Sequence, residues 1–248
     1  MTAPASRVAL VTGGTGAIGT EICRALAAQG CRVAALGHPS EAARIPDWQK
    51  SSGFDAAVEL CDLGDFDAAG AAVRKVESAL GPVDILVNCA GITRDARFVK
   101  MSLQQWREVI ASNLDSVFNA TKPVFEGMCT RGFGRIVNIS SVNGQRGQFG
   151  QANYSAAKAG MHGFTMALAQ EGAARGVTVN TVSPGYVETP MTSAIKPEVL
   201  AKIVASVPAG RMARPDEIAR AVAFLCADES AYITGANLAV NGGLYMSA

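Results

Sequence analysis

Charged and aromatic side chains are both scarce in this sequence, and the charges that are present nearly cancel. Charged residues make up 17% and aromatic residues 6% of the 248 residues, and 22 basic against 21 acidic side chains leave a formal net charge of +1. Without a cluster of lysine and arginine, the chain lacks the surface that dominates nucleic-acid binding, so no nucleic-acid partner is expected. No run approaches 18 consecutive apolar residues, so no membrane partner is expected either.

Cysteine pairs at metal-binding or redox spacing are also missing. The six cysteines never occur as CxxC, and their neighbours are mostly apolar. Reduced and mostly buried thiols are therefore expected, without a metal site. The first residues lack the basic and apolar regions of a secretory signal, which predicts a cytoplasmic protein. The 49% of hydrophobic residues is typical of a globular protein.

Short β-branched runs alternate with longer amphipathic segments, as in a parallel sheet with crossover helices. The predicted strands are 8–12, 32–36, 55–60, 84–88, 135–140, 177–183 and 237–240. The predicted helices are 18–29, 66–80, 103–131, 154–175 and 215–227. We therefore predict an α/β fold, a doubly wound sheet of seven parallel strands with helices on both faces. No linker divides the chain, so a single domain is expected over 1–248.

Within that domain, we expect a cofactor-binding part over about 1–140 and a catalytic and substrate-binding part over about 141–248. The segment 184–210 contains four prolines and a short helical stretch near 197–204. Because it follows the sixth strand, it is predicted to cover a site at the carboxyl ends of the strands.

The first predicted strand is followed directly by a turn rich in small residues. Gly14, Gly16 and Gly19 form a GxGxxG pattern between that strand and a predicted helix. Small residues allow a tight turn there, and the N-terminus of the helix can bind the pyrophosphate of a dinucleotide. A glycine-rich connection in an unrelated α/β protein would look the same, but the position in the first strand–helix unit favours a dinucleotide site.

The end of the second predicted strand bears on the choice of dinucleotide. An acid there would bind the ribose 2′-hydroxyl of NAD(H), whereas a nearby cation would suit the 2′-phosphate of NADP(H). Gly37 stands where the acid would be, and His38, Ser40 and Arg44 follow it. We therefore predict NADPH, with NADH as the alternative. In the competing interpretation His38 and Arg44 are merely solvated, and Glu41 is the residue most able to reverse the preference.

Three residues form a candidate catalytic group. Tyr154 and Lys158 are four residues apart at the start of a predicted helix, so their side chains are neighbours. A phenol has a pKa of about 10, and a neighbouring ammonium favours the phenolate, which makes tyrosine a usable acid and base near neutral pH. Ser141 follows the predicted strand 135–140, where its hydroxyl can hold a substrate carbonyl. Each residue alone has an ordinary structural explanation, but together with the glycine turn they favour catalysis.

In this order, these motifs resemble those of the short-chain dehydrogenases/reductases over essentially the whole chain. The matching segments are 12–19, 61–63, 88–91, Asn113, Ser141, 154–158 and 184–189. The resemblance implies a Rossmann-like fold and an NAD(P)H-dependent oxidoreductase. It further implies that Ser141 positions a carbonyl and that Tyr154 protonates its oxygen. Lys158 would bind the nicotinamide ribose and lower the pKa of Tyr154, and Asn113 would anchor the water of a proton relay.

The resemblance also implies a set of residues along the cofactor. Asp62 would lie near the adenine, Asn88 and Gly91 would line the cleft, and Val187 with Thr189 would hold the nicotinamide carboxamide. The complete expected set is Gly13, Gly14, Thr15, Gly16, Ile18, Gly19, Gly37, His38, Ser40, Arg44, Asp62, Leu63, Asn88, Ala90, Gly91, Tyr154, Lys158, Pro184, Gly185, Val187 and Thr189.

Within the family, the segments 91–95, 100–101, 141–151 and 163–171 resemble the bacterial branch that reduces acetoacetyl-CoA to (R)-3-hydroxybutyryl-CoA for polyhydroxyalkanoate storage. This implies that the substrate is acetoacetyl-CoA or another short 3-oxoacyl thioester. An apolar wall and hydrogen-bond donors suit such a group. The expected substrate residues are Asp95, Lys100, Ser141, Gln148, Phe149, Gln151, Tyr154 and Tyr186.

Two alternatives remain open. The first is reduction of a 3-oxoacyl group on acyl carrier protein in fatty-acid synthesis, for which a basic patch beside the cleft would be expected. Arginine and lysine are scattered instead, at Arg94, Arg97, Lys100, Arg131 and Arg135. The second is a non-catalytic nucleotide-binding scaffold, since the fold alone does not fix function. The complete set of catalytic residues argues against it.

The two longest predicted helices, 103–131 and 154–175, are expected to bury a second apolar face. The residues that suggest this face are Phe118, Val124, Met128, Met161, Phe164 and Leu168. In the resembled family these helices form a dimer interface and the carboxyl-terminal strand builds a tetramer, so a homotetramer is expected.

Overall fold

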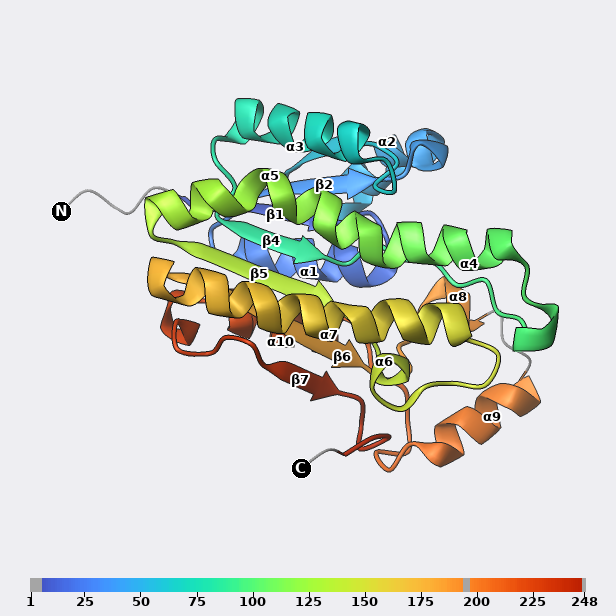
Figure 1. The fold of residues 1–248 in the computed structure, drawn as a ribbon. Coiled ribbons are helices and arrows are strands. Elements are labelled where there is room, and N and C mark those ends of the chain that lie inside the picture. Colours follow the sequence, from blue (N-terminus) through green and yellow to red (C-terminus); the bar gives the residue numbers. More distant parts are fainter. Residues whose placement is uncertain (1–5, 194–196, 247–248) are drawn as a thin grey trace.

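The computed structural model describes residues 6–193 and 197–246, which form a seven-stranded parallel sheet with helices on both faces (Figure 1). The strands are β1 (Val8–Thr12), β2 (Arg32–Gly37), β3 (Ala56–Leu60), β4 (Ile85–Asn88), β5 (Gly134–Ile139), β6 (Val177–Pro184) and β7 (Asn237–Val240). Their order is β3-β2-β1-β4-β5-β6-β7. The predicted Rossmann-like doubly wound sheet is therefore confirmed, with every strand end within one residue of its predicted position.

The central strands are apolar on both faces because helices cover both. In β1, Val8 and Leu10 belong to one core cluster, whereas Ala9 and Val11 belong to the other. All five residues of the strand are buried. Such continuous apolar runs are what a parallel sheet requires, and they made the strands recognisable in the sequence.

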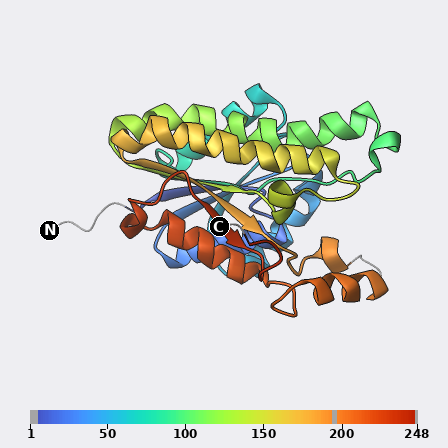
Figure 2. The same ribbon diagram turned by 60° about the horizontal axis from the view of Figure 1, so that its bottom comes forward.

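Two groups of helices enclose the sheet (Figure 2). The helices α1 (Ala17–Ala28) and α10 (Pro215–Cys226) pack on one face, and α3 (Phe66–Leu80), α5 (Ser116–Arg131) and α7 (Ala152–Gly172) pack on the other. The shorter helices are α2 (Ile45–Ser52), α4 (Leu103–Ile110), α6 (Val142–Arg146), α8 (Pro190–Ser193) and α9 (Pro197–Ser206). No helix in the described ranges is long and apolar enough to cross a membrane.

Two local features differ from the predictions. The predicted helix 103–131 is interrupted by a π-helical turn at Ala111–Asp115, which separates α4 from α5. The segment after β2, for which no helix was predicted, forms a 3₁₀ helix, η1 (Pro39–Arg44), that continues into α2.

The residues that suggested a second apolar face lie in different settings within the single chain. Val124, Met128 and Met161 are at most 1% exposed within the single chain. Phe118 is 49% exposed and stacks on Phe66 of α3, with ring centroids 5.9 Å apart. The helical period alone could not distinguish residues buried against the sheet from residues on another face, because α5 and α7 bury a wide stripe against the sheet.

The strand order places a crevice at the carboxyl ends of β1 and β4. The chain runs outward from β1 to β3 and then crosses back to β4, so the connections leave β1 and β4 in opposite directions. Ligands of doubly wound sheets bind at such a switch point. The helices α8 and α9, from the predicted cover segment, lie beyond this same end of the sheet (Figure 1), and residues 194–196 of that segment lie outside the described residues.

Candidate active site

The turn after β1 forms a cradle into which no side chain would fit. Gly13 has a φ of +62°, and a Cβ there would lie 2.9 Å from the Cα of Ala90. A Cβ on Gly14 would lie 2.7 Å from the Cβ of Ala35. Helix α1 then begins at the N-cap Gly16 without a side-chain cap, so its first N–H groups remain available to an anion. These features fit the pyrophosphate of a dinucleotide.

The end of β4 is tied to the end of β1 beside this cradle. The Thr12 hydroxyl accepts the N–H of Cys89 at 3.0 Å and of Ala90 at 3.2 Å. The next residue is Gly91, where a Cβ would lie 3.0 Å from Asn113 Oδ1 and 3.4 Å from Lys158 Nζ. A side chain at Gly91 would therefore crowd both polar groups.

Three consecutive residues at the end of β5 contact the candidate catalytic residues of α7. The Ile139 carbonyl accepts a hydrogen bond from Lys158 Nζ at 2.7 Å. The Ser140 hydroxyl donates to the Lys158 carbonyl at 2.8 Å, and the Ser141 hydroxyl contacts Tyr154. This strand end thus brings Ser141, Tyr154 and Lys158 together, as their order in the sequence predicts.

Burial controls the charge of Lys158. The side chain is only 3% exposed, and burial lowers its pKa from 10.5 to about 8. At neutral pH Lys158 therefore remains an ammonium group. Its hydrogen bond to the Ile139 carbonyl holds it in place, where it can interact with a bound ligand.

The pKa of Tyr154 differs from the expectation. Burial raises it from 10 to about 12, and the contact with Ser141 offsets only part of this rise. Lys158 Nζ lies 5.6 Å from the centre of the Tyr154 ring and is directed at Ile139 instead. In this structure the lysine therefore does not lower the pKa of the phenol, which stays protonated at neutral pH.

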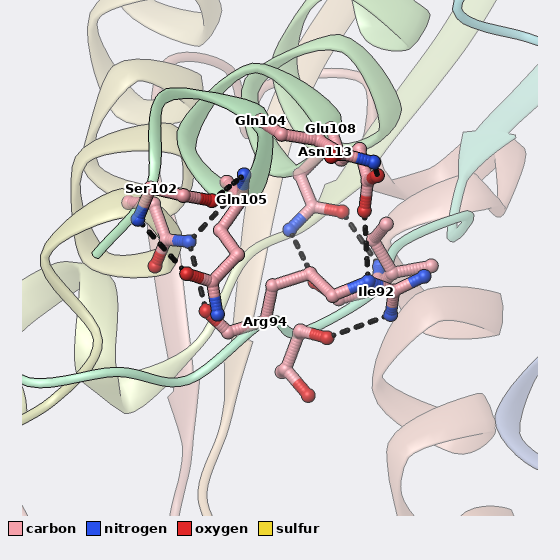
Figure 3. A network of polar contacts seen from close by, with 9 residues as sticks. Ile92, Arg94, Ser102, Gln104, Gln105, Glu108 and Asn113 are labelled. Atoms are coloured by element: carbon pink, nitrogen blue, oxygen red, sulfur yellow. Dashed lines mark hydrogen bonds and ion pairs between the residues drawn. The ribbon is translucent and has the colours of Figure 1, made fainter. Parts of the chain in front are cut away.

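Asn113 is fully buried in the π-helical turn and holds the segment after β4 (Figure 3). Its amide nitrogen donates to the Ile92 carbonyl at 2.8 Å, and its amide oxygen accepts the Ile92 N–H at 2.7 Å. Such turns are frequent at functional sites. Both polar ends of the Asn113 side chain therefore bind the backbone of Ile92, in the segment that leads from Gly91 toward the expected substrate residues.

The same segment is fixed again further along. Arg94 forms an ion pair with Glu108 of α4 at 2.9 Å (Figure 3). Asn153, at the start of α7, donates to the carbonyls of Arg94 and Gln105, each at 3.1 Å. Asn153 was not identified from the sequence, although its position next to Tyr154 is the signal that could have pointed to it.

The predicted substrate residues fall into a connected group and an exposed group. Gln151 donates to Asp95 at 2.8 Å and accepts from Asn143 at 2.9 Å. This chain links the segment after β4 to α6, which Ser141 caps. In contrast, Lys100, Gln148 and Phe149 are exposed, and Phe149 is 81% exposed.

At the other side of the crevice, β6 leads into the predicted nicotinamide segment. Pro184 ends the strand, and a Cβ on Gly185 would lie 2.9 Å from the Cα of Asn241. Val187 is 5% exposed, and the carbonyl of the half-buried Tyr186 accepts the N–H of Ala213 at 2.9 Å. The Thr189 N–H donates to Thr192 at 2.8 Å.

Asp62, which was expected near the adenine, and Asn88, which was expected to line the cleft, lie in different settings. Asp62 is exposed and accepts the N–H of Gly64 at 2.9 Å, next to the buried Leu63. Asn88 is only 1% exposed, and its amide nitrogen donates to Asn138 at 2.8 Å and to Thr121 at 3.2 Å. The amide nitrogen of Asn88 therefore ties β4 to β5 and α5 inside the core, whereas its buried Oδ1 accepts no hydrogen bond within the described residues.

Known proteins match this chain over nearly its full length. A family model described as enoyl-(acyl carrier protein) reductase matches residues 14–245. The acetoacetyl-CoA reductase of Allochromatium vinosum is 63% identical, over 97% of this chain and 99% of that protein. The acetoacetyl-CoA reductase of Cupriavidus necator is 56% identical, over 97% and 98%. The 3-oxoacyl-[acyl-carrier-protein] reductase of Escherichia coli is 46% identical, over 97% and 98%.

Proposed function

The chain belongs to the short-chain dehydrogenase/reductase family, and we propose that it reduces acetoacetyl-CoA to (R)-3-hydroxybutyryl-CoA with NADPH, as a homotetramer in the cytoplasm. The observation that carries this proposal is the identity of 63% and 56% to two acetoacetyl-CoA reductases, against 46% to the carrier-protein reductase. The proposed product is the precursor of polyhydroxybutyrate.

The residues at the end of β5 and the start of α7 supply the acid chemistry. When bound, the reduced nicotinamide supplies a hydride to the carbonyl carbon. The Ser141 hydroxyl holds the carbonyl oxygen, and Tyr154 donates its phenolic proton to that oxygen as negative charge develops. A pKa of about 12 keeps Tyr154 protonated at neutral pH, which suits a proton donor in the direction of reduction.

Lys158 and Asn113 support that step. The Lys158 ammonium, which the Ile139 carbonyl holds beside Tyr154, is proposed to bind the nicotinamide ribose. Asn113 keeps the backbone at Ile92 in place and, with it, the wall of the cleft beside Lys158. We also propose that the Asn113 turn anchors the water through which the phenolate regains its proton.

The loop that joins α6 to α7 is the proposed site of the acyl group. The exposed Phe149 gives an apolar wall, and Gln148 and Gln151 offer amide donors for the thioester oxygen. Asp95, Lys100 and Tyr186 are proposed to lie along the CoA arm.

Three of the five basic residues considered for an acidic carrier protein are paired or buried. Arg94 is paired with Glu108, Arg131 lies 3.5 Å from Asp84, and Arg135 is 3% exposed. The other two, Arg97 and Lys100, are exposed, as is Arg146 at the end of α6. A non-catalytic scaffold would have no need of the buried Lys158 beside a protonated tyrosine.

Initial rates test the proposal directly. Oxidation of NADPH, and separately of NADH, is followed with acetoacetyl-CoA and with an acetoacetyl-carrier-protein substrate, using one enzyme preparation. We expect the highest kcat/KM with acetoacetyl-CoA. A higher kcat/KM with the carrier-bound substrate would assign the chain to fatty-acid synthesis, and no turnover with either would support the scaffold.

Light scattering tests the assembly. Phe66, Phe118 and Met166 on α3, α5 and α7 are each about half exposed, at 52%, 49% and 52%, and would be covered in an oligomer. We expect a solution mass about four times the chain mass of 25.6 kDa. A mass equal to that of one chain would disprove the tetramer.

A further inference from the structure

A chain of hydrogen-bonded side chains joins the segment after β4 to the loop between α6 and α7. Gln151 Nε2 donates to Asp95 Oδ2 at 2.8 Å, and Asn143 Nδ2 donates to Gln151 Oε1 at 2.9 Å. The backbone reinforces this connection, since the Ala96 N–H donates to the Gly150 carbonyl at 2.9 Å. Asp95 and Asn143 are therefore coupled through Gln151.

The Asp95 carboxylate sets the direction of the whole chain. A carboxylate accepts hydrogen bonds and donates none, so Gln151 turns its nitrogen toward Asp95 and its oxygen toward Asn143. Asn143 directs its own nitrogen at that oxygen, which leaves its Oδ1 without a bond to Gln151. This Oδ1 is buried and has no hydrogen-bond partner among the described residues. Because an unpartnered buried oxygen is costly, the chain to Asp95 holds the Asn143 amide in this orientation at the expense of its other end.

Residue 143 also contacts the catalytic group, but through its backbone. Asn143 is 9% exposed, and its N–H donates to Ser141 Oγ at 3.1 Å. Since Ser141 Oγ accepts this N–H, its own hydrogen remains for a substrate carbonyl. Every substitution except proline keeps the N–H of residue 143. The backbone contact with Ser141 and the side-chain contact with Gln151 can therefore be changed separately.

We propose that Asn143 is a positioning residue, which together with Asp95 fixes the Gln151 amide with its nitrogen toward the thioester of the substrate. Gln151 Nε2 carries two hydrogens, and the one that does not bind Asp95 is available to the thioester oxygen. With the amide turned round, Oε1 would face the Asp95 carboxylate and the thioester oxygen, which are both acceptors. The inference rests on the proposed function, because it concerns how the thioester of that reaction is bound.

Asn143→Asp opposes the direction of the chain and keeps the size of the side chain. With a carboxylate at both ends, Gln151 Oε1 faces an acceptor whichever way the amide turns. We expect Tm to fall by about 2–8 °C and KM for acetoacetyl-CoA to rise about 10-fold. The N–H on Ser141 is unchanged, so kcat should change little. Calorimetry and initial rates measure these quantities.

Adding Asp95→Asn to Asn143→Asp reverses the chain. The new amide at position 95 donates to Gln151 Oε1, and Gln151 Nε2 donates to the new carboxylate at position 143, so each group has a partner again. We expect most of the lost Tm to return. KM should stay about 3- to 10-fold above that of Asp95→Asn alone, because Gln151 then presents its oxygen to the thioester. A residue with a merely structural role would recover KM together with Tm.

A matched control makes the same change of amide to carboxylate elsewhere. Gln49 lies on the exposed surface of α2, and Gln49→Glu should leave both KM and Tm unchanged. If Asn143→Asp alone folds poorly, the comparison of the double variant with Asp95→Asn still decides the question.

An unchanged Tm in Asn143→Asp would overturn the inference, as would a double variant that matches Asp95→Asn in KM once Tm has returned. A wild-type chain that reduces no 3-oxoacyl thioester would disprove the proposed function. The return of Tm in the double variant would even then support the direction of the chain, so the two failures are distinguishable.

Discussion

Replacing Tyr154 by phenylalanine is expected to lower kcat by about 10²- to 10⁴-fold, the range associated with loss of a positioned general acid. The substitution removes one hydroxyl and keeps the ring, so the helix start at Ala152 and the packing around Lys158 should persist. Cofactor binding should therefore change little. The measurement is kcat at saturating acetoacetyl-CoA, together with a fluorescence titration of NADPH.

The exposed Tyr232 offers a matched control, since its side chain is fully exposed and lies outside the site. Tyr232→Phe should leave both quantities unchanged. If Tyr154→Phe kept the wild-type kcat, the proton would have to come from another group, and Tyr154 would not be the acid. A loss of NADPH binding as large as the loss of kcat would mean that the ring had moved.

Much of the fold could be predicted because the strands carry their own signal. Buried strands of a parallel sheet read as short apolar runs, and the five residues of β1 are a clear example. The break between α4 and α5 carries no comparable signal. It is stabilised by the pairing of Asn113 with Ile92, which is 21 residues away in the sequence and brought close only by the fold.

In the candidate site, the sequence likewise predicted which residues meet but not the environment that sets their pKa values. The order of Ser141, Tyr154 and Lys158 indicated which residues meet at the end of β5. The sign of the pKa change at Tyr154 was not predictable, because it depends on burial and on the direction of Lys158 Nζ toward the Ile139 carbonyl. Likewise, Glu41 follows Gly37 by four residues, and only the path of η1 returns its carboxylate to the end of β2 beside Gly37.

Lys158→Met is expected to inactivate the enzyme and to stabilise the cofactor-free protein. Loss of the ammonium should lower kcat by about 10²- to 10³-fold, the effect of removing one preorganised electrostatic group. The lowered pKa of Lys158, about 8 instead of 10.5, corresponds to a cost of roughly 3 kcal/mol for keeping the charge buried. Removing the bond to the Ile139 carbonyl offsets about 1–3 kcal/mol of the gain. A net stabilisation of about 1 kcal/mol would raise Tm by about 2–4 °C.

The pH dependence of that stabilisation separates burial of charge from simple improvement of packing. The unfolded lysine keeps its proton up to a pH near 10.5, whereas the folded one releases it near 8, so the unfolded state binds more protons between these values. The wild type therefore gains stability relative to Lys158→Met as pH rises from about 8 to 10.5, and the full advantage of the variant is present below pH 8. Urea unfolding at pH 7 and pH 10 measures the difference. The exposed Lys75, paired with Glu59 at 3.3 Å, provides the control Lys75→Met, for which we expect no such dependence. An advantage of Lys158→Met that is equal at both pH values would show that packing, not the buried ammonium, sets the stability of this site.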